Sequence, residues 1–417
     1  MKATRIREKV RRGDRLRVLF LNDLGFQYGA GMGHLRQIQS FLLLGHEVRG
    51  ICWTQGVLED NIALVPQGAQ GLWLGMRQLT GAHPDHGCDD DAIIKMIVQE
   101  AVSYGPDVII VGNLHGAKWP LELFPELQSL GTIVVGYMHD CYLVTGRCAY
   151  PGECSLYKVG CDETCPTADE YPPLAPARIP AAWRLRRQIF CGDTGVPLAA
   201  NSAWTLAMAQ KSLQDMRFGQ VVSLGLDERL FKPIDRSLAR RLLKIPQESF
   251  VILSGAVNVK DRRKGGDIFK EVLTTLNGRA QFLLFGAESE RMQGVYATGL
   301  LRDYRKMPLL YSAADLFLGT SLEEAFGLTL CEASACGLPI VAFRVGGIPE
   351  IVQNDVNARL VDQISSGGLL EEIESFMADP KKREAFGRAG RSLVEKEFTL
   401  AHQAERWRHY LKAVVQL

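Results

Sequence analysis

Short apolar runs of strand length alternate with longer amphipathic segments along the first half of this chain, and this alternation constrains the fold more than any other feature. Amphipathic segments such as 35–44 and 92–103 separate successive runs. Strands that are buried on both faces and connected through helices belong to parallel sheets. We therefore expect a parallel sheet covered by helices on both faces, with buried strands at residues 17–23, 47–53, 107–113, 132–138 and 197–201.

The same pattern restarts in the second half, with buried runs at 251–256, 281–286, 315–320 and 339–343. A chain of 417 residues is too long for one ordinary core. Two doubly wound, Rossmann-like α/β domains facing a central cleft are therefore predicted, at residues 1–232 and 233–399. Turn residues and Pro233 interrupt the pattern near the join, at 224–237. Ligands of such folds bind at the carboxyl ends of the strands.

Composition narrows the class of protein. Hydrophobic content of 47% and charge of 23% are those of a globular protein, and a formal net charge of +1 gives no field that would favour nucleic acid. No apolar run is long enough to span a bilayer, and the basic N-terminus lacks the apolar stretch of a secretory signal. We expect a cytoplasmic protein, with peripheral contact at the inner membrane face as an open alternative.

Two basic segments leave that alternative open. Residues 1–18 are expected to form a solvated, partly disordered arm, or else a patch that contacts anionic headgroups. Residues 178–190 interleave arginines with apolar side chains. They form either a helix that packs its apolar face or a contact with a membrane or a lipid-linked acceptor.

The most specific motif lies at residues 319–352, which read as strand, polar loop, helix, strand and glycine loop. Glu324 lies in the polar loop at the end of the first strand of this motif, and Glu332 follows eight residues later. Helix amides beginning at Phe326-Gly327-Leu328 would form an anion site. Gly346 and Gly347 let the backbone approach a ligand. Carboxylates suit sugar hydroxyls, so the layout fits a diphosphate between two sugars, which is a nucleotide sugar.

This stretch resembles the retaining GT-B glycosyltransferases of the large family that carries an E-x7-E element and includes bacterial polysaccharide enzymes (glycosyltransferase family 4-like). The resemblance implies that Glu324 contacts hydroxyls of the donor sugar, that Glu332 contacts the ribose, and that amides at residues 326–328 hold the diphosphate. It is specific at 315–352 and diffuse elsewhere. It also implies that a terminal helix, 400–417, completes the N-terminal, acceptor-side domain, whereas residues 233–399 bind the donor.

A basic loop at 259–267 follows the first strand of the second half. The family carries an Arg and a Lys here that neutralise the donor diphosphate. Lys264-Gly265 matches the Lys-Gly of the pattern, but the arginine is not at its usual spacing. Lys264 is therefore expected at the phosphates, with Arg263 as a helper. A solvated basic loop is the alternative.

Candidate groups in the first half follow two strands. Gly29, Gly31 and Gly33 lie in a glycine-rich loop that the family closes on donor phosphate and acceptor. His139 and Asp140 follow the strand at 132–138, and the family places a His or Asp there at the reacting centre. A polar pair that merely caps the strand end is the alternative. Weaker candidates are His34, Asn113 and His115.

Four cysteines crowd an irregular insertion at 140–182, spaced C-x5-C-x6-C-x3-C: Cys148, Cys154, Cys161 and Cys165. Four thiolates can surround one structural zinc, and a cytosolic setting disfavours disulfides. Plain thiols are the alternative, and we expect no catalytic metal at this insertion. A similar cysteine-rich segment occurs in some bacterial polysaccharide glycosyltransferases.

The expected reaction moves a sugar from a nucleoside diphosphate to an acceptor hydroxyl with retention of configuration, and requires no cofactor. Helix amides and Lys264 would stabilise the departing diphosphate. The acceptor would be a glycan, a glycolipid or a small molecule. Alternatives are a catalytically silent sugar-nucleotide-binding scaffold, and another GT-B enzyme such as a phosphorylase or epimerase. A nicotinamide oxidoreductase is disfavoured, because no acidic residue ends the second strand.

Overall fold

The computed structural model describes residues 2–54, 65–258, 261–287, 289, 294–301 and 303–417, which form two compact units. Unit 1 contains residues 1–224 and 400–417, and unit 2 contains residues 225–399. The chain therefore passes between the units twice, and the division falls after Leu224 where the sequence analysis places it after residue 232. Leu226 and Thr399, at the two crossings, form a parallel bridge.

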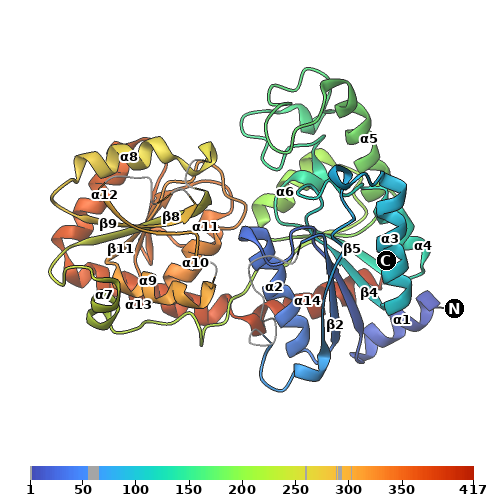
Figure 1. Ribbon diagram of the computed structural model, residues 1–417, viewed down its shortest axis with the longest axis horizontal. Helices are drawn as coiled ribbons and strands as arrows, with labels where there is room; N and C mark the ends of the chain where they lie inside the picture. Colours follow the sequence, from blue (N-terminus) through green and yellow to red (C-terminus); the bar gives the residue numbers. More distant parts are fainter. Residues whose placement is uncertain (1, 55–64, 259–260, 288, 290–293, 302) are drawn as a thin grey trace. The chain divides into compact units, whose positions relative to one another are not determined.

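Unit 1 is built on a sheet of seven parallel strands in the order β3-β2-β1-β4-β5-β6-β7. Strands β2, β4 and β5 of this sheet are labelled in Figure 1. The strands are β1 (Arg17–Leu21), β2 (Glu47–Cys52), β3 (Trp73–Gln78), β4 (Val108–Val111), β5 (Ile133–Met138), β6 (Leu198–Ala200) and β7 (Gly219–Val221). The helices are α1 (Lys2–Arg12), α2 (Tyr28–Leu43), α3 (Asp90–Tyr104), α4 (Leu123–Ser129), α5 (Ile179–Phe190), α6 (Ala203–Ser212) and α14 (Leu400–Val414).

Unit 2 repeats the architecture on a parallel sheet of order β10-β9-β8-β11-β12-β13. Its strands are β8 (Val251–Asn258), β9 (Gln281–Ala287), β10 (Val295–Gly299), β11 (Leu316–Gly319), β12 (Ile340–Phe343) and β13 (Ala358–Val361). Its helices are α7 (Arg236–Leu243), α8 (Gly266–Thr275), α9 (Met307–Ala313), α10 (Leu328–Ala335), α11 (Ile348–Ile351), α12 (Ser366–Ala378) and α13 (Pro380–Glu397). The predicted fold class, two doubly wound parallel units, is confirmed.

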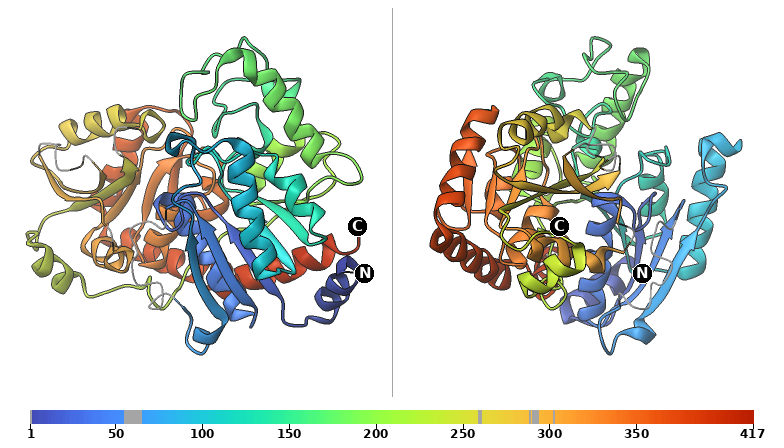
Figure 2. Two further views of the ribbon diagram at one scale, coloured as in Figure 1. Left: turned by 45° about the vertical axis from the view of Figure 1, so that its right-hand side comes forward. Right: turned by 60° about the vertical axis from the view of Figure 1, so that its left-hand side comes forward.

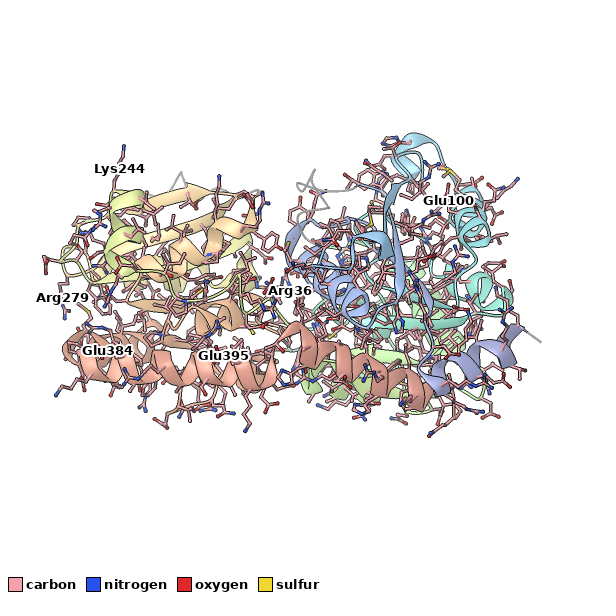
Figure 3. All side chains as sticks on the ribbon, turned by 90° about the horizontal axis from the view of Figure 1, so that it is seen from below. Arg36, Glu100, Lys244, Arg279, Glu384 and Glu395 are labelled. Carbon is pink, nitrogen blue, oxygen red and sulfur yellow. The ribbon has the colours of Figure 1, made fainter. Side chains whose placement is uncertain are left out.

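The central strands are apolar on both faces because helices cover both. Leu19 of β1 and its partner Ile109 of β4 are fully buried, as are Ile252 of β8 and Leu316 of β11. Charge gathers on the outer helices and turns, where Lys244, Arg279 and Glu384 are exposed (Figure 3). Each sheet therefore offers its strand ends, and not its faces, to a ligand.

Three expectations are corrected. The basic N-terminus is a helix rather than a disordered arm: α1 buries Ile6 and Val10, and Lys9 pairs with Asp107 at 2.9 Å. The four half-exposed edge strands β3, β7, β10 and β13 were not predicted. Helix α2 begins at Tyr28 and not near residue 35, so the predicted glycine loop is helical.

The irregular segment after β5 contains only short 3₁₀ turns before α5, and it stands out from the sheet of unit 1 beside that helix (Figure 2). Helix α5 packs Ile189 and Phe190 against the core, and it buries Arg186, whose guanidinium donates to the carbonyl of Tyr142 at 2.9 Å. No helix among the described residues is long and apolar enough to cross a membrane.

Candidate active site

Both sheets reverse their strand order at one place, between β1 and β4 in unit 1 and between β8 and β11 in unit 2. At such a reversal the connections leave in opposite directions and open a crevice at the carboxyl ends of the strands. The polar residues singled out from the sequence follow these strands or their neighbours. The fold therefore gives each unit one candidate ligand site, and the two are described separately.

An ion pair lies at the reversal of unit 2. Lys264 ends a 3₁₀ turn after β8, and its Nζ donates to Oε2 of Glu324, in the loop after β11, at 2.7 Å. Both side chains are partly exposed, at 25% and 16%. The two predicted residues are thus brought together, with an ammonium and a carboxylate open to a polar ligand.

Close backbone packing fixes this pair in place. Thr320 Oγ1 donates to the carbonyl of Lys264 at 2.7 Å, and a Cβ on Gly265, at φ +64°, would lie 2.1 Å from the carbonyl oxygen of Thr320. A Cβ on Gly346, at φ +55°, would lie 1.9 Å from the carbonyl oxygen of Glu324, which accepts from the amide of Gly347 at 2.9 Å. Gly346 and Gly347 therefore hold the backbone of Glu324, a role that the sequence analysis did not assign.

Helix α10 begins directly after Glu324. Gly327 is its N-terminal cap with φ +100°, a conformation that favours glycine, and Phe326 before it is buried. The amide of Leu330 donates to the carbonyl of Gly327 at 3.0 Å. The amides of Leu328 and Thr329, by contrast, have no carbonyl partner one turn earlier in the helix. These donors, together with the positive end of the helix dipole, lie next to the Lys264–Glu324 pair and favour an anion.

Glu332 lies within α10, four residues after Leu328, and is 7% exposed. Its Oε2 accepts a hydrogen bond from the hydroxyl of Tyr311, on α9, at 2.8 Å. Because Tyr311 is fully buried, this bond orients one carboxylate oxygen from inside the unit.

Arg263 folds back on its own loop. Its guanidinium forms a two-bonded pair with Asp261, through Nε at 3.2 Å and NH2 at 2.5 Å. Arg263 is thus paired with a carboxylate of its own loop, whereas Lys264 is paired with Glu324 from the loop after β11. Two residues of the predicted basic loop, Val259 and Lys260, lie outside the described residues.

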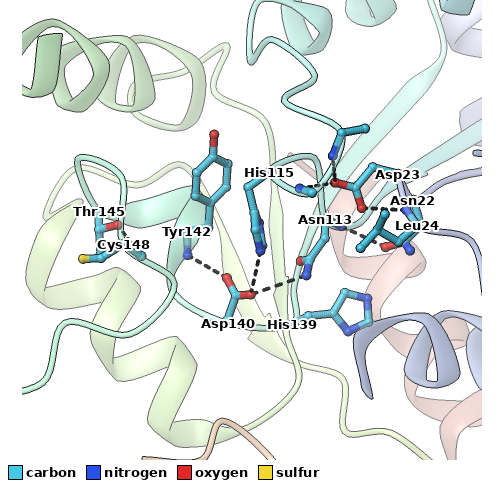
Figure 4. A network of polar contacts seen from close by, with 12 residues as sticks. Asn22, Asp23, Leu24, Asn113, His115, His139, Asp140, Tyr142, Thr145 and Cys148 are labelled. Carbon is cyan, nitrogen blue, oxygen red and sulfur yellow. Dashed lines mark hydrogen bonds and ion pairs between the residues drawn. The ribbon is translucent and has the colours of Figure 1, made fainter. Parts of the chain in front are cut away.

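In unit 1 a hydrogen-bonded network joins the ends of β1, β4 and β5 (Figure 4). Asp140 accepts from the amide of Tyr142 at 2.8 Å and from Nδ2 of Asn113 at 3.4 Å, and it lies 3.8 Å from Nε2 of His115. Asn22 Oδ1 accepts from the amide of Asn113 at 3.1 Å. The predicted residues Asn113, His115 and Asp140 thus share one site.

His139 precedes Asp140 in the chain and lies beside this network (Figure 4). Burial, followed by the nearby charge of His115, lowers the pKa of His139 from 6.5 to about 3, so the imidazole is neutral. Burial also lowers the pKa of His34 well below its usual value. His139 Nε2 and both ring nitrogens of His34 are buried without a hydrogen-bond partner within the described structure. The two histidines are neutral, unsatisfied polar groups at the carboxyl end of the sheet.

Asp23, the second residue after the reversal strand β1, was missed by the sequence analysis. Its carboxylate accepts from the amides of Gly116 at 2.5 Å, Ala117 at 3.0 Å and Leu24 at 2.8 Å. Burial raises the pKa of Asp23, although these hydrogen bonds and the charge of His115 act to lower it. Asp23 thereby positions the loop that carries His115. The available signal was a polar pair directly after a buried strand, the same pattern that identified His139-Asp140.

The three glycines at the start of α2, Gly29, Gly31 and Gly33, have different surroundings. A Cβ on Gly31 would lie 2.5 Å from the carbonyl oxygen of Gly25, and one on Gly33 would lie 3.1 Å from the ring of His139. A Cβ on Gly29 would meet nothing within 4 Å. Close packing therefore explains Gly31 and Gly33, and Gly29 alone faces open space.

The four clustered cysteines line one small cavity in the segment after β5. All four are free thiols. As placed, no three cysteine, histidine or carboxylate side chains in the described part of the chain form a group ready to hold a metal ion. Zinc binding here stays a prediction, because the thiols would have to close around the ion.

Comparison with known proteins bears on these sites. Residues 243–393 match the family described as "Glycosyl transferases group 1". The matched segment contains Lys264, Glu324 and Glu332, and it lies within unit 2. The site geometry of unit 2 therefore belongs to a segment with glycosyltransferase relatives.

One curated relative is the D-inositol 3-phosphate glycosyltransferase of Segniliparus rotundus, 34% identical over 189 residues, which are 41% of each chain. Another is the sulfoquinovosyl transferase SQD2 of Arabidopsis thaliana, 28% identical over 49% of this chain and 41% of its own. The chain thus spans about two fifths of the length of these relatives.

A solved structure resembles nearly the whole chain. Sucrose-phosphate synthase from Thermosynechococcus elongatus superimposes with a TM-score of 0.72, covering 96% of this chain and 100% of its own, at 17% sequence identity. Identity this low shows the fold alone. The fold is GT-B, with two Rossmann-like units.

Proposed function

We propose that this chain is a retaining glycosyltransferase that moves a sugar from a nucleoside-diphosphate sugar to an acceptor hydroxyl, in the synthesis of a glycan, polysaccharide or glycoconjugate. The observation that carries the proposal is the Lys264–Glu324 pair, 2.7 Å apart, at the strand-order reversal of unit 2 and beside the N-terminus of α10. The family match over the same residues supports it.

Each group of unit 2 has a role in this reaction. Lys264 and the first-turn amides of α10, at Leu328 and its neighbours, bind the diphosphate and stabilise the negative charge that grows on it as the glycosidic bond breaks. Glu324 accepts hydrogen bonds from hydroxyls of the donor sugar. Glu332, oriented by Tyr311, accepts from the ribose hydroxyls. Since the positive charge for the leaving group comes from Lys264 and the helix, the proposal calls for no divalent cation.

The proposed transition state is oxocarbenium-like, with positive charge on the sugar and negative charge on the departing phosphate. For retention, the acceptor hydroxyl attacks from the face that the phosphate leaves, and the phosphate takes its proton. No side chain is needed as a nucleophile.

Unit 1 is proposed to bind the acceptor through His115, Asp140 and Asn113. A carboxylate beside an amide and an imidazole can accept and donate hydrogen bonds to several hydroxyls, which suits a glycan, a glycolipid or a small polyol. His139 is proposed to contact the donor sugar as a neutral group. The proposal places the protein in the cytoplasm, with peripheral membrane contact if the acceptor is lipid-linked.

The first test is calorimetry of the purified chain against UDP, GDP, ADP and dTDP, with and without EDTA, followed by the sugar conjugates of the nucleotide that binds. A ligand that binds only the folded state also raises the melting temperature. We expect one nucleotide series to bind equally well with EDTA present. Binding to none of them would contradict the donor site.

The second test separates an enzyme from a silent scaffold. The donor that binds is incubated with candidate acceptors, and the configuration of the new bond is read from proton NMR coupling at the anomeric position. A product with the donor's configuration is expected. Donor binding without any turnover, across acceptors of all three classes, would favour the sugar-nucleotide-binding scaffold.

A further inference from the structure

The cavity in the segment after β5 brings together residues that the proposed transfer reaction does not use. Its wall contains all four clustered cysteines, Cys148, Cys154, Cys161 and Cys165, together with Arg147 and Thr167. Its volume is about 10 Å³, which is room for a single water molecule or ion. Cys148 is buried and the other three are half-buried, so the site is closed to larger ligands.

Two of the sulfur atoms lie within hydrogen-bonding distance of polar groups that can donate to them. The amide of Gly146 donates to Sγ of Cys161 at 3.2 Å, and the hydroxyl of Thr167 lies 3.9 Å from Sγ of Cys165. Gly146 is needed for the first contact, since a Cβ there would lie 2.5 Å from Cβ of Cys161. Hydrogen bonds to sulfur stabilise thiolates, and in metal centres they tune the bound ion.

The charge of Arg147 is the second, independent observation. Its side chain is 3% exposed, and its guanidinium donates to the carbonyls of Glu170 at 2.6 Å and Pro172 at 2.9 Å and to Thr167 Oγ1 at 3.0 Å. All three acceptors are neutral, and Nε of Arg147 has no hydrogen-bond partner within the described structure. A buried cation without a counter-ion is unfavourable, so negative charge in the cavity would stabilise Arg147.

We propose that Cys148, Cys154, Cys161 and Cys165 bind one Zn²⁺ as a structural tetrathiolate site, with Arg147 as its counter-ion. Four thiolates around Zn²⁺ carry a net double negative charge, of which the guanidinium neutralises one unit. The thiols reach tetrahedral distances by closing on the ion, and binding displaces their four protons to solvent. Two disulfides, by contrast, would leave Arg147 without a counter-ion.

The site has a structural consequence for unit 1. The carbonyl groups that bind Arg147 belong to the residues on either side of Tyr171, whose ring lies 5.5 Å from that of His115. Holding Arg147 in place therefore holds Tyr171 against the network of His115 and Asp140. This part of the inference rests on the acceptor role proposed for unit 1, whereas zinc binding itself does not.

The direct experiment measures metal in the full chain. Protein purified under reducing conditions is dialysed against metal-free buffer and analysed by inductively coupled plasma mass spectrometry, and we expect about one zinc per chain. Titration with p-hydroxymercuribenzoate in the presence of 4-(2-pyridylazo)resorcinol should release that zinc as the thiols react. Absence of zinc, together with failure of the reduced chain to take up added Zn²⁺, would overturn the proposal. So would iron in its place, or disulfides among the four cysteines by mass spectrometry.

Variants locate the site. Cys161→Ser and Cys165→Ser should each lose most of the bound zinc, whereas Cys88→Ser and Cys191→Ser, at half-buried cysteines outside the cavity, should retain it. Arg147→Met keeps all four thiols, so weaker zinc retention in a competition with EDTA would test the counter-ion directly. Retention equal to that of the unmodified chain would remove Arg147 from the site. Circular dichroism distinguishes loss of metal from loss of the fold.

A last measurement separates the inference from the proposed function. The zinc-free chain should bind the nucleotide as the zinc-bound chain does, because the proposed donor groups lie in unit 2, while the acceptor KM should rise. Zinc content without any transfer activity would leave the metal site standing and contradict the proposed function. An unchanged acceptor KM would overturn the link through Tyr171.

Discussion

At the strand-order reversal of unit 2, a lysine and a glutamate meet at partly exposed positions, 2.7 Å apart. At the reversal of unit 1, by contrast, the side chains of Asp23, His139 and Asp140 are nearly fully buried, and His139 is neutral. One fold thus presents a partly exposed ion pair in one unit and nearly fully buried hydrogen-bonding groups in the other. The contrast matches the chemistry proposed for each, a charged diphosphate in unit 2 and neutral hydroxyls in unit 1.

The largest effect should follow from removing the cation of unit 2. Lys264→Ala is expected to lower the transfer rate by about 10²–10³-fold, the usual effect of losing one donor to a developing negative charge. Stability should change by less than about 1 kcal/mol, because the Lys264–Glu324 pair is partly exposed. Steady-state kinetics and thermal melting check both. Lys270→Ala, at an exposed lysine that pairs with Asp267, is the control. A near-normal rate in Lys264→Ala would show that transfer does not need the cation of unit 2, and it would contradict the role that separates the two units.

A smaller effect is expected at Glu332. Glu332→Gln keeps an oxygen for Tyr311 but loses the charge-assisted bonds proposed to the ribose, so nucleotide affinity should fall about thirtyfold. Calorimetry with the natural nucleotide and with its 2′-deoxy analogue gives a double-mutant cycle. The loss should be much smaller for the analogue. An equal loss for both would show that Glu332 does not contact the 2′-hydroxyl. Glu371→Gln, at an exposed position on α12, is the control.

The buried histidines of unit 1 predict how its stability depends on pH. His139 has a pKa of about 3 when folded and about 6.5 when unfolded, so the unfolded chain binds the extra proton as pH falls below 6.5. The free energy of unfolding should therefore decrease on acidification, by about 2 kcal/mol between pH 7 and pH 5 for this one group. Replacement of His139 by Gln should remove that share of the pH dependence.

Urea denaturation followed by tryptophan fluorescence measures this in unit 1 alone, because all six tryptophans of the chain lie there. His409→Gln, at an exposed histidine of the same unit, is the control. A pH dependence that is the same with and without His139 would show that its imidazole is accessible to protons in the folded state.

The smallest effect is expected at Asp140. Asp140→Asn keeps the shape of the side chain but removes its charge, so the acceptor KM should rise about tenfold while nucleotide affinity is unchanged. Steady-state kinetics with the acceptor found in the product assay, together with calorimetry, separates the two. Asp169→Asn, at an exposed carboxylate nearby in the chain, is the control. A change in nucleotide affinity instead would assign Asp140 to the donor.

The sequence was sufficient to predict the central strands but not the outer ones. Strands buried on both faces appear as continuous apolar runs, as in β4 and β12. The edge strands β3 and β10 are half-exposed and contain glycine and polar residues, so they lack that signal. Helix α2 was placed late because its first turns contain three glycines, which have low helix propensity and are tolerated here through close packing.

The two candidate sites also differed in how much of each could be predicted from the sequence. In unit 2 the groups lie within one short segment plus Lys264, so the spacing of Glu324 and Glu332 could be recognised. In unit 1 they come from three strand ends that only the sheet order brings together. Asp23 was missed because it was taken as the last residue of the strand expected at 17–23, whereas β1 ends at Leu21. The cysteine spacing indicated a cluster, but the buried charge of Arg147 could be found only in the structure.

Helix α14 belongs to unit 1 although it follows unit 2 along the chain. It packs on α2, where Trp407 lies 5.2 Å from Phe41, and its Gln403 accepts from Ser40 Oγ at 3.0 Å. During synthesis on the ribosome, unit 2 is therefore translated and can fold before α14 has been made and can cover the apolar side of α2. Completion of unit 1 is a late event in translation, so nascent chains that stall within unit 2 should depend on chaperones to shield that surface.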